Sequence, residues 1–332
     1  MEKTKLALFG LGRAGQFHLQ SIRALSQVRL KYLFDVDASR GPALAEEMNC
    51  QFTTDPHEIY ADPEVEAVIV ATPTQTHYGY VTSSLAAGKH VLAEKPLGVT
   101  LDEIDRCYEL AAAAQRVLFI AFNRRFDPSF ASLVQRVHQG EIGETQIIRT
   151  TSRDNPCPSL DYIKTSCGIF HDCIVHDLDM VCFIQPETPA EVFAWGSTFM
   201  APIREVGDLD TVIVALRFPS GTLATIDISR KSVYGYDQRV EVFGSKGMLE
   251  ARNRLSDTTV LATEAGLRQA TVQFSFPTRY REAYLIELEQ FVQCARLNRP
   301  APLTHRQVRL SHLLADAAEE SHRTGRAVAV RT

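Results

Sequence analysis

Residues 5–15 read KLALFGLGRAG, an apolar run that ends directly in the glycine pattern G-x-G-x-x-G. A helix-like stretch follows over Gln16–Leu25, and a second apolar run, Leu30–Phe34, stops at Asp35. The order is therefore strand, glycine turn, helix, strand and acid. This order predicts the first βαβ unit of a dinucleotide-binding sheet, because each part has a separate task in holding the ligand.

The three glycines and the acid divide those tasks between them. Gly10 permits the tight turn, Gly12 lets the backbone approach a pyrophosphate, and Gly15 lets the helix pack closely on the strand. The free N–H groups at the start of the helix attract the phosphates, and Asp35 can accept hydrogen bonds from a ribose diol. The residues expected to bind the dinucleotide here are Gly10, Gly12, Arg13, Ala14, Gly15 and Asp35.

Length and composition describe an ordinary globular protein. The chain has 332 residues, 45% of them hydrophobic and 23% charged, which suggests two domains. A net charge of −5 gives no indication of a nucleic-acid partner, and no apolar run is long enough to span a membrane. The chain begins its first strand almost at once, so we expect no targeting peptide. The seven cysteines lack zinc-site spacing, which favours reduced thiols in a cytoplasmic protein without a metal.

The first third of the chain alternates short apolar runs with helical patterns, which predicts a doubly wound parallel α/β sheet over residues 1–122. Ligands of such sheets bind at the carboxyl ends of the strands. The loops that follow two of the strands should therefore line the cofactor site. The expected cofactor contacts from these loops are Thr72, Pro73, His77, Glu94 and Lys95.

The remaining residues, 123–332, have a different rhythm. Closely spaced strand patterns with turn signals at Pro219–Gly221 and Ser245–Gly247 predict antiparallel neighbours, with helices before and after them. We therefore expect a second, α+β domain built on a largely antiparallel open sheet. The alternation in Thr225–Ser229 indicates that one sheet face packs on helices. The other face, formed by Thr222, Ala224, Ile226 and Ile228 or by their alternates, is a candidate for packing against a second subunit.

One predicted helix, Ile169–Ile184, carries polar side chains that suggest chemistry. Its apolar stripe recurs every three or four residues, while Asp172, His176 and Asp179 lie on a different face. A carboxylate one turn from an imidazole raises its basicity and orients it, as a general base requires. An exposed acid–histidine pair without function is the alternative, since such pairs are common on helix surfaces.

Lys95 adds to the case for an active site. It follows a strand that should end at the cofactor site, and Pro96 restricts its backbone. A lysine at this place can donate a hydrogen bond to a substrate oxygen. The alternative is an ordinary exposed lysine.

With these motifs in place, the chain resembles the Gfo/Idh/MocA oxidoreductases over nearly its whole length. The resemblance rests on the glycine motif, on AEKP at residues 93–96, and on DCIVHD at residues 172–177, in this order and at these intervals. FNRRF at residues 122–126 and YGYD at residues 234–237 also fit. Within the family, the chain is most similar to the inositol 2-dehydrogenases.

The resemblance implies an NAD-dependent oxidation of a secondary hydroxyl on a cyclic polyol, myo-inositol being favoured, without a metal. It implies that Lys95, Asp172 and His176 are the catalytic residues. His176 would accept the hydroxyl proton, Asp172 would orient the imidazole of His176, and Lys95 would stabilise the developing alkoxide. The substrate contacts it implies are Lys95, Arg125, Asn155, Asp172, His176 and Tyr236. The loop containing Asn155 resembles the inositol enzymes only loosely, so the reaction type is better defined than the polyol.

Other interpretations stay open at this point. The same fold and catalytic residues would suit scyllo-inositol, an aldose or an amino sugar. A dinucleotide-binding sensor without turnover is a third possibility. NAD is expected over NADP because Asp35 would repel a 2′-phosphate, although Arg40, expected within the next helix, could compensate. We also expect a homo-oligomer, a tetramer or a dimer.

Overall fold

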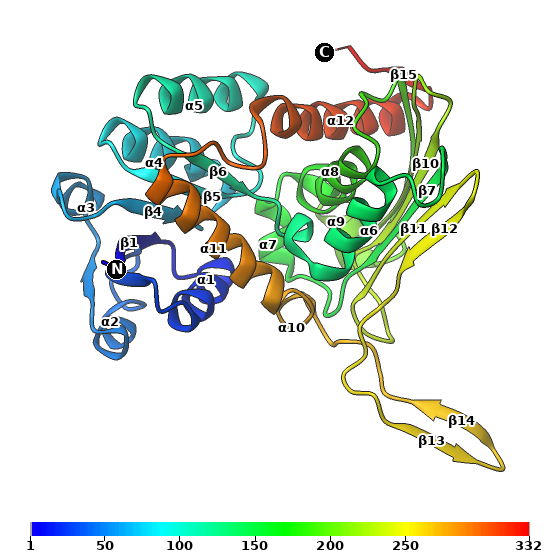
Figure 1. Cartoon of the computed structure of the whole chain (residues 1–332), viewed down its shortest axis with the longest axis horizontal. Helices are drawn as coiled ribbons and strands as arrows, with labels where there is room; N and C mark the ends of the chain where they lie inside the picture. Colours follow the sequence, from blue (N-terminus) through cyan, green and yellow to red (C-terminus); the bar gives the residue numbers. More distant parts are fainter. Residues whose placement is uncertain (1, 332) are drawn as a thin grey trace. The chain divides into compact units, whose positions relative to one another are not determined.

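A computed structural model describes residues 2–331 of the chain. It divides into two compact units, one formed by Met1–Phe126 with Glu282–Arg309 and the other by Asp127–Arg281 with Leu310–Thr332. The polypeptide is coloured along its sequence in Figure 1. The division expected from the sequence, 1–122 and 123–332, did not include the return of residues 282–309 to the first unit.

The first unit is built on a parallel sheet in the strand order β3-β2-β1-β4-β5-β6. This is the strand order of a doubly wound nucleotide-binding sheet. Strands β2 and β3 extend the sheet on one side of β1, and β4, β5 and β6 extend it on the other side. The strands are apolar and almost wholly buried, as parallel strands covered on both faces must be. Their bounds are β1 Thr4–Phe9, β2 Val28–Phe34, β3 Gln51–Thr53, β4 Ala67–Val70, β5 His90–Glu94 and β6 Leu118–Ala121.

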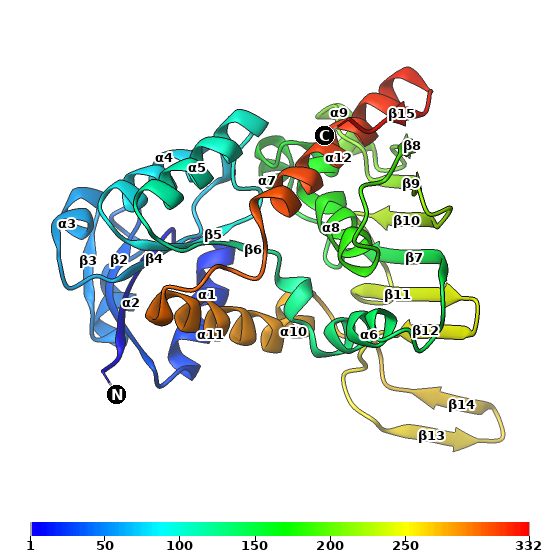
Figure 2. The same cartoon turned by 45° about the horizontal axis from the view of Figure 1, so that its top comes forward.

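Helices cover both faces of this sheet. Figure 2 shows α4 and α5 on one face and α1 and α11 on the other. The core below the sheet includes Leu288, Phe291 and Val292 of α11, which pack with apolar side chains of β1 and β6. The helices of this unit are α1 Arg13–Ala24, α2 Pro42–Met48, α3 Pro56–Ala61, α4 Thr74–Ala86, α5 Leu101–Ala113, the 3₁₀ turn η1 Asn123–Phe126, and α11 Arg281–Leu297.

Several boundaries in this unit differ from the sequence-based expectation. The helix expected over residues 39–48 begins only at Pro42, which suits the first turn of a helix. Arg40 therefore lies before this helix and not within it. The short elements β3 and α3 were not predicted, because three to six residues are too few to show a period.

The second unit contains a mixed, mostly antiparallel sheet in the order β12-β11-β7-β10-β9-β8-β15. Only the neighbours β10 and β7 run parallel, and the other neighbouring pairs of these described strands are antiparallel. The expectation of a largely antiparallel second sheet is therefore confirmed. The bounds are β7 Thr145–Arg153, β8 Glu191–Ser197, β9 Thr211–Arg217, β10 Leu223–Ser229, β11 Asp237–Gly244, β12 Gly247–Ala251 and β15 Val328–Ala329.

The helices of the second unit lie on one face of its sheet and leave the other face bare, as Figure 2 shows. Ala224, Ile226 and Ile228 are buried, so they point toward the helices, and their alternates point outward. The helices are α6 Pro128–His138, α7 Leu160–Thr165, the π-helix η2 Phe170–Ile174, α8 Val175–Ile184, α9 Ala201–Glu205, α10 Phe276–Arg279 and α12 His305–Thr324, whose first residues belong to the first unit.

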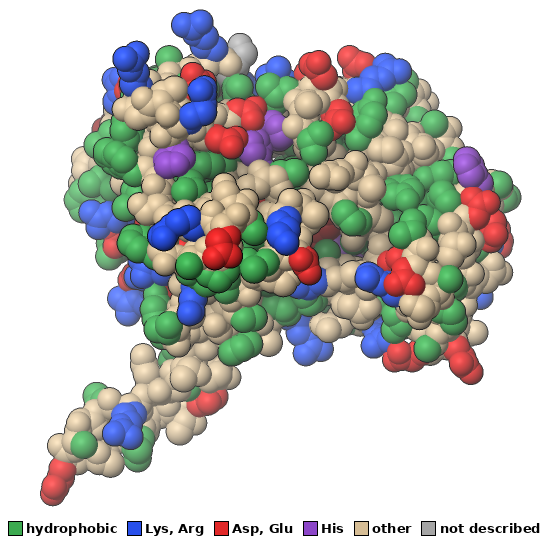
Figure 3. Space-filling view, turned by 180° about the vertical axis from the view of Figure 1, so that it is seen from behind, with side chains coloured by type: hydrophobic (Ala, Val, Ile, Leu, Met, Phe, Trp, Pro, Cys, Tyr) green, Lys and Arg blue, Asp and Glu red, His purple; other side chains and the backbone are tan. Residues whose placement is uncertain are grey.

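A hairpin extends from this sheet into solvent. It consists of β13 Val260–Thr263 and β14 Gly266–Gln269, all of whose residues are exposed, and it forms the projecting finger in Figure 3. The sequence did not predict it, since its residues show no buried face. Across the described residues, no helix combines the length and the apolar character that crossing a membrane demands.

Candidate active site

The glycine turn after β1 has the geometry that its sequence predicted. Gly10 has a positive φ of 92°, and a Cβ there would lie 2.5 Å from the carbonyl oxygen of Ala71. A Cβ on Gly15 would collide with the carbonyl oxygen of Gly10. Larger residues are therefore excluded at both positions by the protein's own backbone.

Gly12 differs from the other two glycines. It is the N-cap of α1, and a Cβ built on it would meet no described atom within 4 Å. Since no described atom fills this space, the N-terminus of α1 can accept the pyrophosphate of a dinucleotide, which binds close to the backbone. Arg13 and Ala14 form the first turn of α1 beside it. The residues present thus fit an NAD-type cofactor.

Asp35 ends β2 in a fixed orientation. Its Oδ2 accepts a hydrogen bond from the backbone N–H of Leu11 at 2.9 Å, and its Oδ1 accepts one from Asp37 at 3.0 Å. The acid is thereby tied to the glycine turn. Arg40 pairs with Asp37, at 3.1 Å, so its guanidinium is engaged by a different carboxylate from the one expected to bind ribose. Hydrogen bonds from Ser39, together with Arg40, lower the pKa of Asp37.

His77 joins the loops that follow β4 and β5. Its two ring nitrogens lie 2.8 Å from the carbonyl oxygens of Pro96 and Thr72. Burial lowers the pKa of His77, although both carbonyls favour the protonated ring. The ring is thus a buried clamp that fixes the loop backbone, while Pro73, the exposed N-cap of α4, lies at the surface.

Glu94 and Lys95 lie at the carboxyl end of β5 and have different surroundings. Glu94 is buried, and its Oε1 lies 2.9 Å from Nε2 of His18. Burial disfavours its charge, but the hydrogen bond and charge of His18 more than offset this, so the pKa of Glu94 is lowered. Lys95 is only half-buried and follows directly. The pair therefore places an anchored acid directly before a partly exposed lysine.

Glu287 of α11 is a further buried acid in this unit. It is fully buried, and neither carboxylate oxygen has a hydrogen-bond partner among residues 2–331. Burial, reinforced by the charge of Glu94, raises the pKa of Glu287 well above its ordinary value of 4.5.

Arg125, expected to contact substrate, is buried in the η1 turn after β6.

In the second unit, the helix with the acid–histidine pair does not begin as an α-helix. Residues Phe170–Ile174 form the π-helix η2, which continues into α8 at Val175. Asp172 and Asp179 are buried and His176 is half-buried. The alternative of an exposed surface pair is therefore excluded. A π-helical segment is often found at functional sites because it re-aims side chains.

Asp172 accepts hydrogen bonds from Tyr162 and Arg230, neither of which a sequence pattern predicted. The hydroxyl of Tyr162 in α7 donates to Oδ1 at 2.6 Å, and Arg230 donates from Nη1 to Oδ2 at 3.0 Å. Charge-assisted hydrogen bonds of this kind favour the ionised carboxylate. Asp172 is thus held in a fixed orientation on the same helical segment as His176.

Arg230 follows β10 and is completely buried. It also donates to Oδ2 of Asp208 at 2.8 Å, so a single guanidinium bridges two carboxylates. Burial disfavours its charge, but the Cys173 sulfur and the carboxylates of Asp172 and Asp208 raise the pKa of Arg230 above its ordinary value. The cation therefore stays charged and fixes Asp172 from the side of the sheet.

Other buried polar contacts fix α8 between the sheet and α12. The hydroxyl of Ser152 on β7 lies 2.7 Å from Oδ1 of Asp177 and 3.1 Å from Oε1 of Gln238 on β11. On the opposite side of the helix, Asp179 accepts a hydrogen bond from Ser311 of α12 at 3.4 Å. These contacts set the position of the helix that carries His176.

Asn155 and Tyr236, the remaining residues expected to contact substrate, lie near the end of β7 and before β11. The side-chain amide of Asn155 donates to the carbonyl oxygen of Phe274 at 2.8 Å. Tyr236 is buried and packs edge-on against Tyr280. Asn155 is therefore tied to the segment before α10, and Tyr236 belongs to an aromatic cluster.

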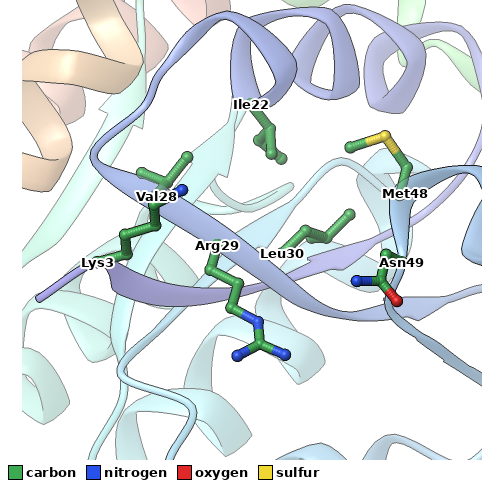
Figure 4. A pocket seen from close by; sticks show the side chains of 7 residues that line it. All are labelled: Lys3, Ile22, Val28, Arg29, Leu30, Met48 and Asn49. Carbon is green, nitrogen blue, oxygen red and sulfur yellow. The ribbon is translucent and has the colours of Figure 1, made fainter.

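The pocket in Figure 4 is not part of this site. It has a volume of about 300 Å³ and lies at the amino ends of β1 and β2, where Lys3, Val28 and Arg29 line it together with Met48 and Asn49. Ligands of parallel sheets bind at the opposite, carboxyl ends of the strands.

The structure thus groups the expected residues within each unit. The first unit brings the glycine turn together with Asp35, and the loop of Thr72 together with that of Lys95 through His77. The second unit brings Asp172 and His176 onto one helical segment. Tyr162, Arg230 and Asp208 were not predicted. A charged residue directly after a strand of alternating apolar and polar residues, as Arg230 is, was the one available signal.

Comparisons with known proteins agree with this geometry. Residues 4–122 match the family described as "Oxidoreductase family, NAD-binding Rossmann fold", and residues 130–250 match the GFO/IDH/MocA C-terminal domain. The chain belongs to the Gfo/Idh/MocA oxidoreductase family.

Individual members of the Gfo/Idh/MocA family match nearly the whole chain. Myo-inositol 2-dehydrogenase of Thermotoga maritima is 41% identical, with 98% of each chain covered. Inositol 2-dehydrogenase of Rhizobium meliloti is 37% identical, with 87% of each covered. Among solved structures, scyllo-inositol dehydrogenase of Lactobacillus casei with bound NAD(H) and scyllo-inositol has a TM-score of 0.92 at 26% identity and covers 100% of both chains.

Proposed function

We propose that the protein is an NAD-dependent inositol 2-dehydrogenase, which oxidises one secondary hydroxyl of myo-inositol to a ketone. The proposal rests on the buried Asp172, which is held by Tyr162 and Arg230 on the same helical segment as His176. A fixed carboxylate beside a histidine is what proton abstraction from a hydroxyl requires. Membership of an NAD-binding oxidoreductase family and the names of the relatives support the same reaction.

The dinucleotide would be held by residues of the first unit. The N–H groups at Gly12–Ala14 would donate to its phosphates, and Asp35 would accept from the adenosine ribose hydroxyls. His77 keeps the two neighbouring loops together, and Glu94, bonded to His18, anchors the backbone that presents Lys95. When bound, NAD⁺ supplies the hydride acceptor.

Three side chains would act on the reacting hydroxyl. His176 would accept its proton, while Asp172 stabilises the imidazolium that results. Lys95 would donate a hydrogen bond to the same oxygen and favour the negative charge that develops on it. Arg125, Asn155 and Tyr236 would orient the other hydroxyls of the ring.

A polyol screen tests the proposal. The enzyme is mixed with NAD⁺ and each of myo-inositol, scyllo-inositol, glucose and an amino sugar, and NADH formation is followed. The proposal expects the highest kcat/KM with myo-inositol. A clear preference for scyllo-inositol, the ligand of one structural relative, would keep the reaction and change the substrate. NAD binding without turnover on any of them would identify a sensor.

We also propose that the active protein is a homo-oligomer, a tetramer or a dimer, joined through the bare sheet face. Leu223, Ile147, Phe243 and Met248 lie in register across four neighbouring strands, which makes an outward apolar row. Three of the four are at least 44% exposed. A second copy of the same sheet would cover such a row.

Seven free cysteines favour a reducing, cytoplasmic setting.

A further inference from the structure

Two histidines and two acids converge where η2 meets α12. His171 lies in η2, and His312, Asp316 and Glu319 follow one face of α12 at spacings of four and three residues. Figure 1 shows α12 running beside α8, and Ser311 and Asp179 bond across that boundary. All of these residues belong to the second unit, and none of them takes part in the proposed reaction.

One ring nitrogen of each histidine lies within 4 Å of the same carboxylate oxygen. Nε2 of His171 lies 3.1 Å from Oδ1 of Asp316, and Nε2 of His312 lies 3.9 Å from the same oxygen. The two imidazole rings have centroids 4.7 Å apart. Oε2 of Glu319 lies 3.7 Å from Nε2 of His171, so a second carboxylate is within reach.

These separations suit the ligands of a small cation. One ligand atom each from His171, His312 and Asp316 all lie within 4.8 Å of one another. Bonds of about 2.0–2.2 Å to zinc in a tetrahedron place the ligand atoms roughly 3.4 Å apart, so shifts of a few tenths of an ångström to about an ångström would complete the site. Imidazole nitrogen with carboxylate oxygen favours zinc, nickel or cobalt over magnesium or calcium.

Burial and charge also favour a cation here. Both histidines are buried, so their rings are held by packing, whereas Asp316 is about half exposed and gives access from solvent. The two carboxylates supply the two negative charges that a divalent cation needs for balance.

We propose that His171, His312 and Asp316 form a binding site for a divalent transition-metal ion of the zinc class, with Glu319 or water as the fourth ligand. The ion takes no part in hydride or proton transfer. It joins η2 to α12, and because Asp172 directly follows His171, it braces the segment that carries the catalytic carboxylate.

Metal titration of the whole enzyme tests the site. Chelator-treated protein is titrated with Zn²⁺ by calorimetry and with Co²⁺ by visible absorption, whose intensity distinguishes tetrahedral from octahedral coordination. We expect one saturable site per chain, intense Co²⁺ bands, and a higher unfolding temperature when Zn²⁺ is present. His312→Gln and the half-exposed Asp316→Asn should each weaken binding by about 10-fold to 100-fold or more.

The matched control is His305→Gln. His305 lies on the same helix and also pairs with an aspartate, Asp105 at 2.6 Å, but has no second histidine among its described partners. It should leave metal affinity unchanged. Absence of saturable binding would overturn the proposal and leave a histidine–carboxylate ion pair only. Binding that persists in both His312→Gln and Asp316→Asn would place the metal elsewhere and overturn it equally.

Discussion

Arg230 donates to Asp172 across 3.0 Å, and both side chains are buried. The guanidinium therefore neutralises the carboxylate of the proposed catalytic helix and, through its second nitrogen, that of Asp208. Removing one member of such a network leaves the others as buried charges without a counter-ion, which is far more costly than losing an exposed pair.

Arg230→Met should therefore destabilise the protein by about 3–5 kcal/mol, measured by urea unfolding. Arg149→Met is the control, because Arg149 forms an exposed pair with Glu241 at 3.2 Å in the same unit. Loss of that pair should cost about 1 kcal/mol or less. Equal effects of the two substitutions would contradict the central role given to Arg230.

His176→Ala should lower kcat by on the order of 100-fold or more, since a positioned acid–base group contributes about 10²–10⁴. Lys95→Ala should act similarly through lost orientation and charge stabilisation. NAD affinity, followed by fluorescence titration, should change much less in both variants. Near-normal turnover of His176→Ala with tight NAD binding would show that the proton goes to another group.

The preference for NAD over NADP should depend on Asp35. Its carboxylate is fixed by Leu11 and Asp37, so it cannot turn away from a 2′-phosphate, and Arg40 is paired with Asp37. In the wild type, kcat/KM should be higher with NAD than with NADP. The difference between the two values should be smaller in Asp35→Ser. Equal or better turnover of the wild type with NADP would refute this assignment.

Glu287 should make stability depend on pH. Its pKa is raised in the folded protein, so between about 4.5 and its folded value the folded state binds more protons than the unfolded state, and stability falls as pH rises. Glu287→Gln, which resembles the neutral acid, should match the wild type near pH 4.5 and exceed it at pH 8. Within that interval, the wild type should lose about 1.4 kcal/mol of unfolding free energy for each rise of one in pH.

The comparison is made by urea unfolding over that pH range. Glu289→Gln, two residues along α11 and only partly buried, should show no such divergence from the wild type. Parallel curves for the wild type and Glu287→Gln would mean that Glu287 ionises normally in the folded protein.

Light scattering at micromolar concentration should give a multiple of the 37.0 kDa chain mass. The double substitution Leu223→Asp with Phe243→Asp should lower that mass, because both residues belong to the outward apolar row. Leu297→Asp, at a 58% exposed position on α11, is the control and should leave it unchanged. A wild-type mass near 37 kDa that is stable to dilution, with activity kept, would reject the proposed assembly.

The sequence predicted those parts of the fold that are specified locally. The glycine turn, α1 and Asp35 lie within about thirty residues, and the local geometry explains why each of these positions has its residue type. The strands of the second sheet were predicted because their alternation is strong, except for β15, whose two residues are too few to show a period. The site residues Asp172 and His176 were indicated by their spacing on a predicted helix and Lys95 by its place after a strand, and the family resemblance gave them catalytic roles.

What the sequence could not predict depends on contacts between distant segments. Arg230 lies 58 residues from Asp172, and no periodic pattern connects them. The apolar positions of α11 are compatible with packing on either sheet. Its position against the parallel sheet of the first unit could therefore not be derived from the sequence. The exposed β13–β14 hairpin lacks the buried face on which strand prediction depends.

The return of α11 means that the nucleotide-binding domain is not a continuous gene segment. A fragment that stops at Phe126 would lack Leu288, Phe291 and Val292, and would expose the apolar underside of its sheet to water. To fold on its own, the nucleotide-binding domain would therefore need the later helix or a substitute apolar cover for its sheet.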